Sequence, residues 1–300
     1  MHTMSTNGTL PCRRRGGFVL LSVLLLGTVL LSAATALTWF ARSVARSVAG
    51  KRNTLEERTF AHVVVKSATV MLGELGEHVT YDAPTQQWYQ PLAVDRNGEP
   101  CVLKITPLDD KIPVRSLFLP DGNTLRTEFA DVWTTLWETL NKPSLGDVVL
   151  DMMDRNDKPR VGSLEAKGWQ NRPLSDMGEL LFLSGDIPPD MLDRLNEYIT
   201  LWSDGSINLN TAPAPVLALL PGLDSGGMAE RLVSWRQEHP LGSVSDIQQI
   251  PGFSGQTVRR LTNIAGVKSR YISLTLDTPT TQFHAIVDRT TRTITKWEEE

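Results

Sequence analysis

Residues 13–41 read RRRGGFVLLSVLLLGTVLLSAATALTWFA, and no ionisable side chain lies between Arg15 and Arg42. An α-helix rises about 1.5 Å per residue, so a helix over residues 18–41 is long enough to cross a bilayer core about 30 Å thick. The sequence therefore predicts one membrane-spanning helix, and this helix decides how the rest of the chain is organised.

The residues just before the run distinguish three interpretations of it. A secretory signal has a shorter apolar region that ends in small residues, whereas Ser32-Ala33-Ala34 lies inside this run. A plain signal anchor fits the length but gives no role to Gly16-Gly17-Phe18. A prepilin-type leader explains the basic segment, the two glycines, which can lie extended in a protease groove because they lack a Cβ, and a retained helix.

Basic residues flank the run on both sides, so charge alone does not orient it. Arg13, Arg14 and Arg15 precede it, and Arg42, Arg46, Lys51, Arg52 and Arg58 follow it. The positive-inside rule counts Lys and Arg at both ends and gives no clear answer here. The orientation therefore follows from the leader interpretation, in which the cut is made on the cytoplasmic side.

The helical pattern continues beyond the run. Apolar positions recur without a proline until Pro84, which predicts one long helix from Phe18 to about Leu75. The alternative is two helices broken near Gly50.

The remaining composition is that of an ordinary globular protein. Of the 300 residues, 41% are hydrophobic and 21% are charged, with a net charge of −4. Loss of residues 1–17 would leave 27 basic against 34 acidic residues, a net charge of −7, which offers little attraction for nucleic acid. It would also discard Cys12 and leave Cys101 as a lone thiol, so we expect no internal disulfide.

Strands are predicted at both ends of the body and helices between them. Short segments rich in β-branched and aromatic residues, bounded by turn residues, lie at 86–94, 101–106, 114–119, 271–276, 283–288 and 291–297. The amphipathic or proline-bounded segments 128–140, 189–202, 215–220, 229–238, 244–250 and 257–264 are typical of helices. This order predicts an α+β fold in which a helical region is inserted into an antiparallel sheet.

Two motifs recur inside the helical region. Ser175-Asp176 and Ser245-Asp246 each precede an apolar turn, which is typical of a helix cap. LPGL at 220–223 and IPGF at 250–253 each end one short helix and open another. The repetition indicates two small units of the helix-hairpin-helix or SAM-like type.

The motifs of common enzymes are missing from the sequence. The five histidines form no H-E-x-x-H pair, and neither G-x-S-x-G nor G-x-x-x-x-G-K-[ST] occurs. His62 is expected on a helix surface and His284 in a strand. We therefore expect no catalytic residues and no enzymatic activity.

A DNA-binding function is the alternative from another class. INLNTA at 207–212, followed by Leu-Pro-Gly, resembles the helix-hairpin-helix domains of competence DNA receptors, whose hairpins present backbone amides to a phosphate. The second glycine of that hairpin is replaced here by Asp224 in one unit and Ser254 in the other. A carboxylate at the phosphate position repels the ligand.

The sequence as a whole resembles the type II secretion system protein K family, also called general secretion pathway protein K. The resemblance is carried by the leader with its span, the flanking strands, NRPL at 171–174 with its Ser-Asp cap, INLNTA at 207–212 and the Pro-Gly hairpins. The resemblance covers essentially the whole chain. It implies a minor pseudopilin of the inner membrane with its C-terminal body in the periplasm. It also implies a pilin-like fold, a long N-terminal helix plus an antiparallel sheet, that contains an all-helical insertion of two SAM-like units.

The resemblance also implies boundaries for the parts of the chain. These are a cleaved leader at 1–17, a transmembrane helix at 18–41, the first part of the pilin-like domain at 42–122, helical units at 123–205 and 206–267, and completion of the sheet at 268–300. Prepilin peptidase would cut between Gly17 and Phe18 and methylate the new amino group of Phe18.

The same resemblance assigns the protein to the pseudopilus tip, together with other minor pseudopilins. The fifth residue after the cut is Ser22, where most pilins have a glutamate that neutralises the amino terminus of the preceding subunit. A tip subunit has no neighbour ahead of it, and an unpaired buried carboxylate there would be costly. Alternatively, Ser22 is a lipid-facing residue bonded to its own helix.

The family finally suggests a structural calcium ion in the helical region. Hard oxygen donors suit Ca²⁺ and occur here at Asp151, Asp154, Asn156, Asp157 and Glu165. The segment departs from the D-x-[DN]-x-[DN]-G loop, and Glu165 is followed by Ala166-Lys167. A solvated acidic turn is the alternative.

Overall fold

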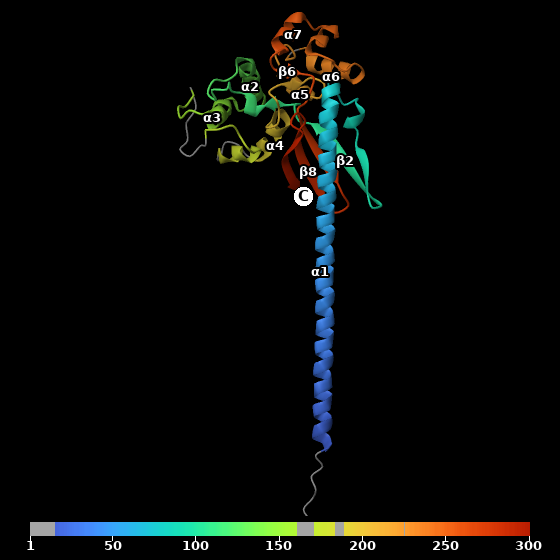
Figure 1. Ribbon diagram of the computed structural model, residues 1–300. Coiled ribbons are helices and arrows are strands. Elements are labelled where there is room, and N and C mark those ends of the chain that lie inside the picture. The colour runs from blue at the N-terminus through green and yellow to red at the C-terminus, as the bar shows by residue number, and fades with distance from the viewer. Residues whose placement is uncertain (1–15, 161–170, 184–188, 225) are drawn as a thin grey trace, which may run out of the picture. The chain divides into compact units, whose positions relative to one another are not determined.

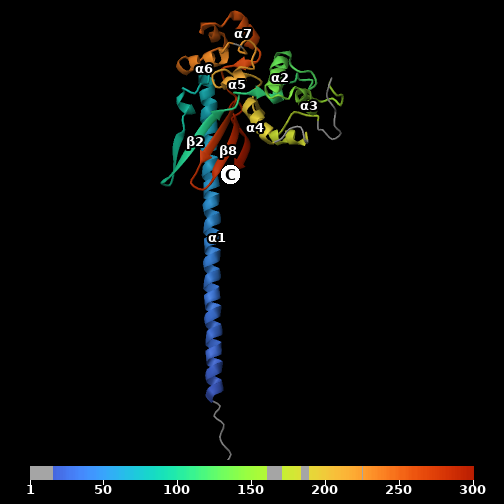
Figure 2. The same ribbon diagram turned by 180° about the vertical axis from the view of Figure 1, so that it is seen from behind.

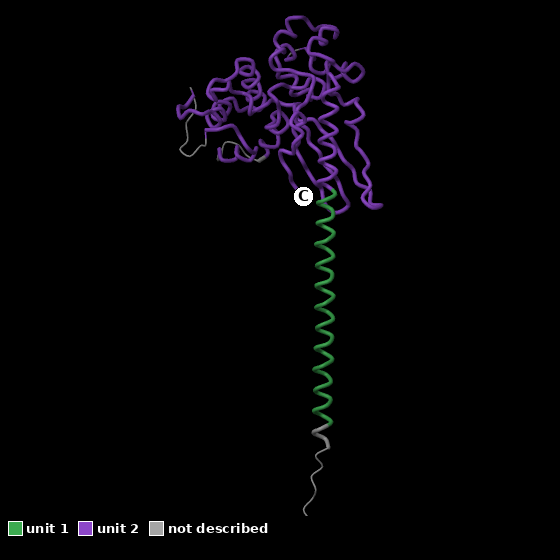
Figure 3. The backbone as a smooth tube through the Cα atoms, viewed as in Figure 1, with its two compact units in different colours: residues 1–60 green, residues 61–300 purple. Residues whose placement is uncertain are grey.

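The computed structural model describes residues 16–160, 171–183, 189–224 and 226–300 (Figure 1). It divides into two compact units, residues 1–60 and residues 61–300 (Figure 3). One helix, α1 (Gly16–His78), supplies the described part of the first unit and begins the second. Gly50 lies inside α1, so the alternative of two helices broken near this residue is wrong.

A five-stranded antiparallel sheet lies in the second unit, in the order β1-β2-β7-β8-β9. Its strands are β1 (Leu92–Arg96), β2 (Glu99–Pro107), β7 (Tyr271–Asp277), β8 (Gln282–Asp288) and β9 (Thr293–Glu299). Leu103 of β2 pairs with Leu276 of β7, so strands from the two ends of the body are neighbours. Everything between them in sequence is an insertion, as predicted.

Alternating side chains place the core on one face of the sheet. Buried apolar residues follow the two-residue period of a strand, for example Leu103 and Ile105 in β2 and Leu274 and Leu276 in β7. The last part of α1 has a matching buried stripe at Ala61, Val65, Ala68 and Leu72, and Figures 1 and 2 show this part of the helix along one face of the sheet. The His62 ring stacks on that of Trp297 in β9, with centroids 4.1 Å apart.

The inserted region is mainly helical. It contains α2 (Thr127–Thr139), α3 (Pro143–Met153), η3 (Met177–Phe182), α4 (Pro189–Tyr198), α5 (Ala214–Leu217), α6 (Met228–Glu238), η4 (Val244–Gln249) and α7 (Gly255–Leu261), where η denotes a 3₁₀ helix. One continuous hydrophobic cluster runs from Ile112 to Ala265. The fold is therefore the pilin-like α+β fold with a helical insertion.

Two short parallel ladders close this region into two segments. Strand β3 (Ile112–Pro113) pairs with β4 (Ile199–Thr200), and β5 (Ile207–Asn208) pairs with β6 (Ala265–Gly266). Each helical segment thus begins and ends at one place. The domain boundaries given above remain predictions, but the ladders show how two successive helical units leave from and return to the sheet.

Some local predictions are wrong. Residues 87–89 form a 3₁₀ turn, η1 (Gln87–Tyr89), and only the end of segment 86–94 belongs to a strand. Segment 114–119 is not a strand, because η2 (Val114–Ser116) follows β3 directly. Helix α3 was not predicted, although Pro143 in its first turn is a helix-start signal.

The second predicted cap also differs. Ser243 is the N-cap of η4 and forms a capping box with Asp246, so Ser245 is not the cap. Asp176 does cap η3, because its side chain accepts a hydrogen bond from the Gly178 amide.

Candidate functional site

The anchor is the first candidate site. Helix α1 contains an apolar window with a mean hydropathy of 2.3, and none of that window is buried. Leu24, Leu31 and Trp39 are 60%, 67% and 73% exposed. An apolar helix of this length with exposed side chains fits a single-pass transmembrane anchor.

The predicted processing site lies at the start of this helix. Gly17 and Phe18 belong to the first turns of α1, and residues 1–15 lie outside the described residues. Ser22 is exposed on α1. Cleavage after Gly17, methylation of Phe18 and the role of Ser22 at a filament tip remain predictions.

The second candidate is the place where the helical region joins the sheet, which we call the junction. It consists of Asp82, Asp109, Asn208, Ser269, Arg270 and Arg289. Four segments of the chain meet here: the one that follows α1, the one that follows β2, the one that links the two helical segments and the one that leads into β7. Ion pairs and hydrogen bonds between residues far apart in sequence hold these segments together.

The buried carboxylate of Asp109 connects three of these segments by hydrogen bonds. Its Oδ1 accepts a hydrogen bond from the Asp204 amide at 2.9 Å, and its Oδ2 accepts from the amides of Arg270 and Tyr271 at 2.8 and 2.9 Å. Burial raises the pKa of Asp109 to about 7, against the opposing effect of these donors. The charge of this carboxylate therefore changes near neutral pH.

Asp82 and Arg289 form a buried ion pair at the same place. The guanidinium donates to Asp82 Oδ2 at 2.7 Å and to the Leu72 carbonyl of α1 at 2.8 Å, and the two side chains are 0% and 5% exposed. Asp82 Oδ2 also accepts from the Ser269 amide at 2.8 Å. Gly76 allows this approach, because a Cβ there would lie 2.5 Å from Arg289 Nε.

The INLNTA motif supplies two buried asparagines with different partners. Asn208 Nδ2 donates to Ser269 Oγ at 2.9 Å, which connects β5 to the junction. Asn210 pairs with both backbone groups of Leu241, donating to its carbonyl and accepting from its amide at 2.9 and 2.8 Å. The motif is thus explained by packing inside the protein and not by a ligand.

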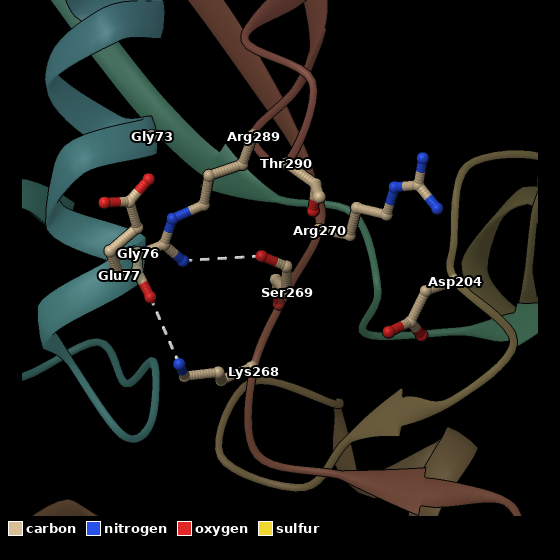
Figure 4. Close-up of a pocket in the computed structure, with 9 residues that line it drawn as sticks. All are labelled: Gly73, Gly76, Glu77, Asp204, Lys268, Ser269, Arg270, Arg289 and Thr290. Carbon is tan, nitrogen blue, oxygen red and sulfur yellow. Dashed lines mark hydrogen bonds between the residues drawn. The ribbon is translucent and has the colours of Figure 1, made fainter.

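A pocket of about 420 Å³ opens beside the junction (Figure 4). Lys268 lines it and donates to the Gly76 carbonyl of α1 at 3.1 Å. Arg270, also on the lining, is held by Asp288 through its Nε and Nη2 atoms, at 3.0 and 2.6 Å from Asp288 Oδ2. The basic groups of this pocket are therefore engaged by the protein itself.

The Pro-Gly hairpins lack the features of a phosphate site. Gly222 and Gly252 have φ angles of 86° and 97°, as a tight turn requires. The Gly222 amide, which a phosphate would need, donates to Asp224 Oδ1 at 3.2 Å. Ser254 is the N-cap of α7 and accepts from the Thr257 amide. The geometry does not favour the DNA-receptor alternative.

The predicted calcium residues are only partly brought together. Asp151 and Asp154 are fully buried, whereas Asp157 is exposed, Asn156 Oδ1 accepts from the Lys158 amide, and Glu165 lies outside the described residues. The Arg160 guanidinium lies between the two buried carboxylates, with its Nε 3.3 Å from Asp151 and its Nη2 3.2 Å from Asp154.

Burial raises the pKa of Asp154, Arg160 opposes this shift, and the neighbouring charge of Asp151 adds to it. No group of three or more His, Cys, Asp or Glu side chains suited to a metal occurs in the described part of the chain. These residues alone therefore fit an ion-pair cluster better than a calcium cage of six to eight oxygens. A bound calcium ion remains a prediction.

His284 forms hydrogen bonds with two hydroxyl groups. Its ring nitrogens lie 2.9 Å from Thr275 Oγ1 and 3.3 Å from Ser273 Oγ, across the β7–β8 pair. Both hydrogen-bonding partners of the ring within the described residues are hydroxyl groups, and neither is a carboxylate that could orient it as a catalytic base.

Comparisons with known proteins point in one direction. Residues 207–268 match the family model described as Type II secretion system (T2SS), protein K. The fold matches a chain in the crystal structure of the GspK-GspI-GspJ complex from the enterotoxigenic Escherichia coli type 2 secretion system. The TM-score is 0.63 and the identity 13%, over 85% of this chain and 99% of that chain. No curated protein matches the sequence.

The resemblance to type II secretion system protein K is confirmed. The segment that the protein K model matches starts at β5 with the INLNTA motif and ends just before the return to β7. It is therefore the segment that Asn208, Ser269 and Asp109 attach to the sheet. The junction itself was not predicted from the sequence, because an isolated aspartate in a turn gives no sign of a partner far along the chain.

Proposed function

We propose that the protein is a minor pseudopilin of a type II secretion system. It lies at the tip of the pseudopilus and initiates or caps the filament that exports folded proteins across the outer membrane. The observation that carries the proposal is the coincidence of the protein K match at 207–268 with a pilin-like fold and a helix long and apolar enough to span a membrane.

The partners follow from the same proposal. The matched structure is a complex of GspK with GspI and GspJ, so the corresponding subunits of this system are the expected neighbours. Prepilin peptidase cuts the leader, α1 anchors the mature chain in the inner membrane, and the body faces the periplasm. The protein acts by assembly and not by catalysis, and nucleic acid is not a partner.

The shape of the body supports a tip position. The two helical segments close on themselves through β3–β4 and β5–β6, and the junction fixes the second of them to the sheet. A bulky, firmly attached insertion would obstruct the addition of a further subunit above it. At position 22 the chain has a serine and not a glutamate, so it lacks the carboxylate that would neutralise the amino terminus of a subunit ahead of it. A tip subunit has no such neighbour.

Co-purification tests the proposal. The full chain, carrying an affinity tag, is co-expressed with prepilin peptidase and with the subunits of its own system that correspond to GspI and GspJ, then extracted in mild detergent. We expect one stable complex containing the three chains. A pilin from an unrelated filament, expressed at the same level, serves as the control and should not be retained. Recovery of the tagged chain alone would contradict the proposal.

A further inference from the structure

A cluster of cations follows the apolar run of α1. It consists of Arg42, Arg46, Lys51 and Arg52, which we call the basic collar. No acidic residue occurs between Ala41 and Glu56, and all four side chains are exposed. Arg52 pairs with Glu56 at 2.8 Å, but these side chains are 80% and 54% exposed, so the pair is weak.

The helical rise places the collar at the membrane surface. If the hydrocarbon core ends near Ala41, Arg42 lies at its edge and Arg46 about 6 Å further out. The headgroup layer on each side of the core is about 5–8 Å thick. Lys51 and Arg52 lie about 14–15 Å from the edge, within about one Debye length of the headgroups.

Two aromatic residues mark the same boundary. Trp39 and Phe40 are separated from the collar by Ala41 alone and are 73% and 62% exposed. Tryptophan is enriched at the interface of membrane and water, where its ring meets the headgroups. The end of the apolar run is therefore an interface on the evidence of its aromatic residues as well as its charges.

The directions of the four side chains indicate the kind of partner. Successive helical residues are about 100° apart, so relative to Arg42 the others lie at about 40° for Arg46, 180° for Lys51 and 280° for Arg52. Cations on several sides of a helix suit a partner that surrounds it. Lipid headgroups do so, whereas an acidic protein segment would approach from one side.

We propose that the basic collar binds the phosphate groups of anionic phospholipids on the membrane face from which the body emerges. Each cation near such a surface contributes favourably, and long basic side chains can reach back to the headgroups. The proposal depends only on α1 crossing the membrane and not on the role in secretion. It also gives a role to the basic residues that follow the run.

Trp39 provides a local probe, because it is the only tryptophan in α1. The full chain is reconstituted in vesicles of phosphatidylcholine and phosphatidylglycerol at one fixed ratio. Two preparations are compared, one with brominated acyl chains on phosphatidylcholine and one with brominated acyl chains on phosphatidylglycerol, at equal mole fraction of the brominated lipid. The stronger quenching of Trp39 then reports which lipid lies against this end of the helix. We expect phosphatidylglycerol to be favoured at least about fivefold at low salt, which corresponds to about 1 kcal/mol, the contribution of one cation. The preference should decrease in 0.5 M salt, about where screening becomes strong.

Two charge-matched variants decide the source of the preference. The collar variant is Arg42→Gln/Arg46→Gln/Lys51→Gln/Arg52→Gln, and its preference for phosphatidylglycerol over phosphatidylcholine should fall to a ratio of about one. Glutamine has a good helix propensity, so α1 should stay helical, which circular dichroism can check. The control variant Lys158→Gln/Arg194→Gln/Arg259→Gln/Arg260→Gln removes four exposed cations of the body and should keep the wild-type ratio. Equal quenching by both lipids in the wild type would overturn the proposal and leave the collar for an acidic protein partner. An unchanged preference in the collar variant, or its loss in the control variant, would overturn it too.

Discussion

Two sites in this protein pair buried carboxylates with arginine, and they differ in charge balance. At the junction, Asp82 faces Arg289, one negative charge against one positive, and both side chains are at least 95% buried. In the helical region, Asp151 and Asp154 are fully buried but share the single guanidinium of Arg160, which is 25% exposed.

The difference indicates what each site does. The junction is balanced in charge, and backbone groups of α1 and of the return segment supply further hydrogen bonds, but Asp82 Oδ1 and Arg289 Nη2 are buried without a hydrogen-bond partner among the described residues. The Asp151–Asp154 site has one more negative charge than positive charges. It is thus more sensitive to any added cation, which is why a calcium prediction belongs there and not at the junction.

The largest effect is expected from Arg289→Met. This change leaves the buried Asp82 carboxylate without a counter-charge and should lower the free energy of unfolding by about 3–5 kcal/mol. Tryptophan fluorescence in urea measures it, because Trp88 lies 5.6 Å from the Arg289 guanidinium.

Two further variants control this result. Arg292→Met breaks a more exposed pair with Glu77 and should cost less than about 1 kcal/mol. Asp82→Asn/Arg289→Met removes both charges and should be more stable than Arg289→Met. Equal losses for Arg289→Met and Arg292→Met would show that the buried pair is not a principal contact of the junction.

The next effect is a pH dependence from Asp109. Its pKa in the folded state is about 7, above its ordinary value of 3.8. Between these two pH values the folded protein therefore holds a proton on Asp109 that the unfolded protein has lost. Stability from this group is therefore present at low pH and is lost as the pH rises through 7, by about 2–3 kcal/mol between pH 5 and pH 8.

Asp109→Asn should flatten this part of the pH profile, even if it lowers stability at every pH. Urea midpoints at several pH values give the comparison, and Asp131→Asn, which changes an exposed carboxylate on α2, should keep the wild-type slope. A wild-type profile that is flat between pH 5 and pH 8 would be inconsistent with a proton on Asp109.

A smaller effect is expected at the unbalanced site. Arg160→Gln leaves two buried carboxylates facing each other and should cost about 1–3 kcal/mol, less than Arg289→Met because Arg160 is partly exposed. If Ca²⁺ competes for the same carboxylates, it should raise the melting temperature of Arg160→Gln more than that of the wild type.

The melting temperature is measured in EDTA and in excess Ca²⁺. Arg155→Gln changes the exposed cation next to Asp154 in sequence and should respond to Ca²⁺ as the wild type does. If Ca²⁺ fails to stabilise either the wild type or Arg160→Gln, calcium binding at Asp151 and Asp154 is excluded.

The smallest effect is expected from an exposed carboxylate. Asp224→Gly restores the second hairpin glycine and frees the Gly222 amide, at a cost within about 1 kcal/mol. Because the overall charge stays negative, we expect no salt-sensitive affinity for duplex DNA, measured by fluorescence anisotropy. Tight binding by the wild type at low salt would instead support the DNA-receptor alternative.

Much of the fold could be predicted because its signals are local. The apolar run of α1, the alternation in β2 and β7 and the apolar side of α2 depend on residues a few positions apart. The errors lie where local signals compete: segment 86–94 has strand-like composition, yet its first part forms a 3₁₀ turn.

The junction could not be predicted in the same way. Asp82 and Arg289 are 207 positions apart in sequence, and Asp109 accepts from an amide 161 positions away. Their partners are fixed by how the inserted region returns to the sheet. The sequence shows the INLNTA motif only as a feature of the family that it resembles, whereas the structure supplies its physical reason in Asn208 and Asn210.

The most direct test of the central claim is mass spectrometry of the full chain, extracted from membranes after co-expression with prepilin peptidase. A pseudopilin should begin at Phe18 with a methylated amino group, while a Gly17→Leu variant should keep its leader. An intact leader in the wild type, or a mature chain that begins at any other residue, would show that the protein is not processed as a pseudopilin.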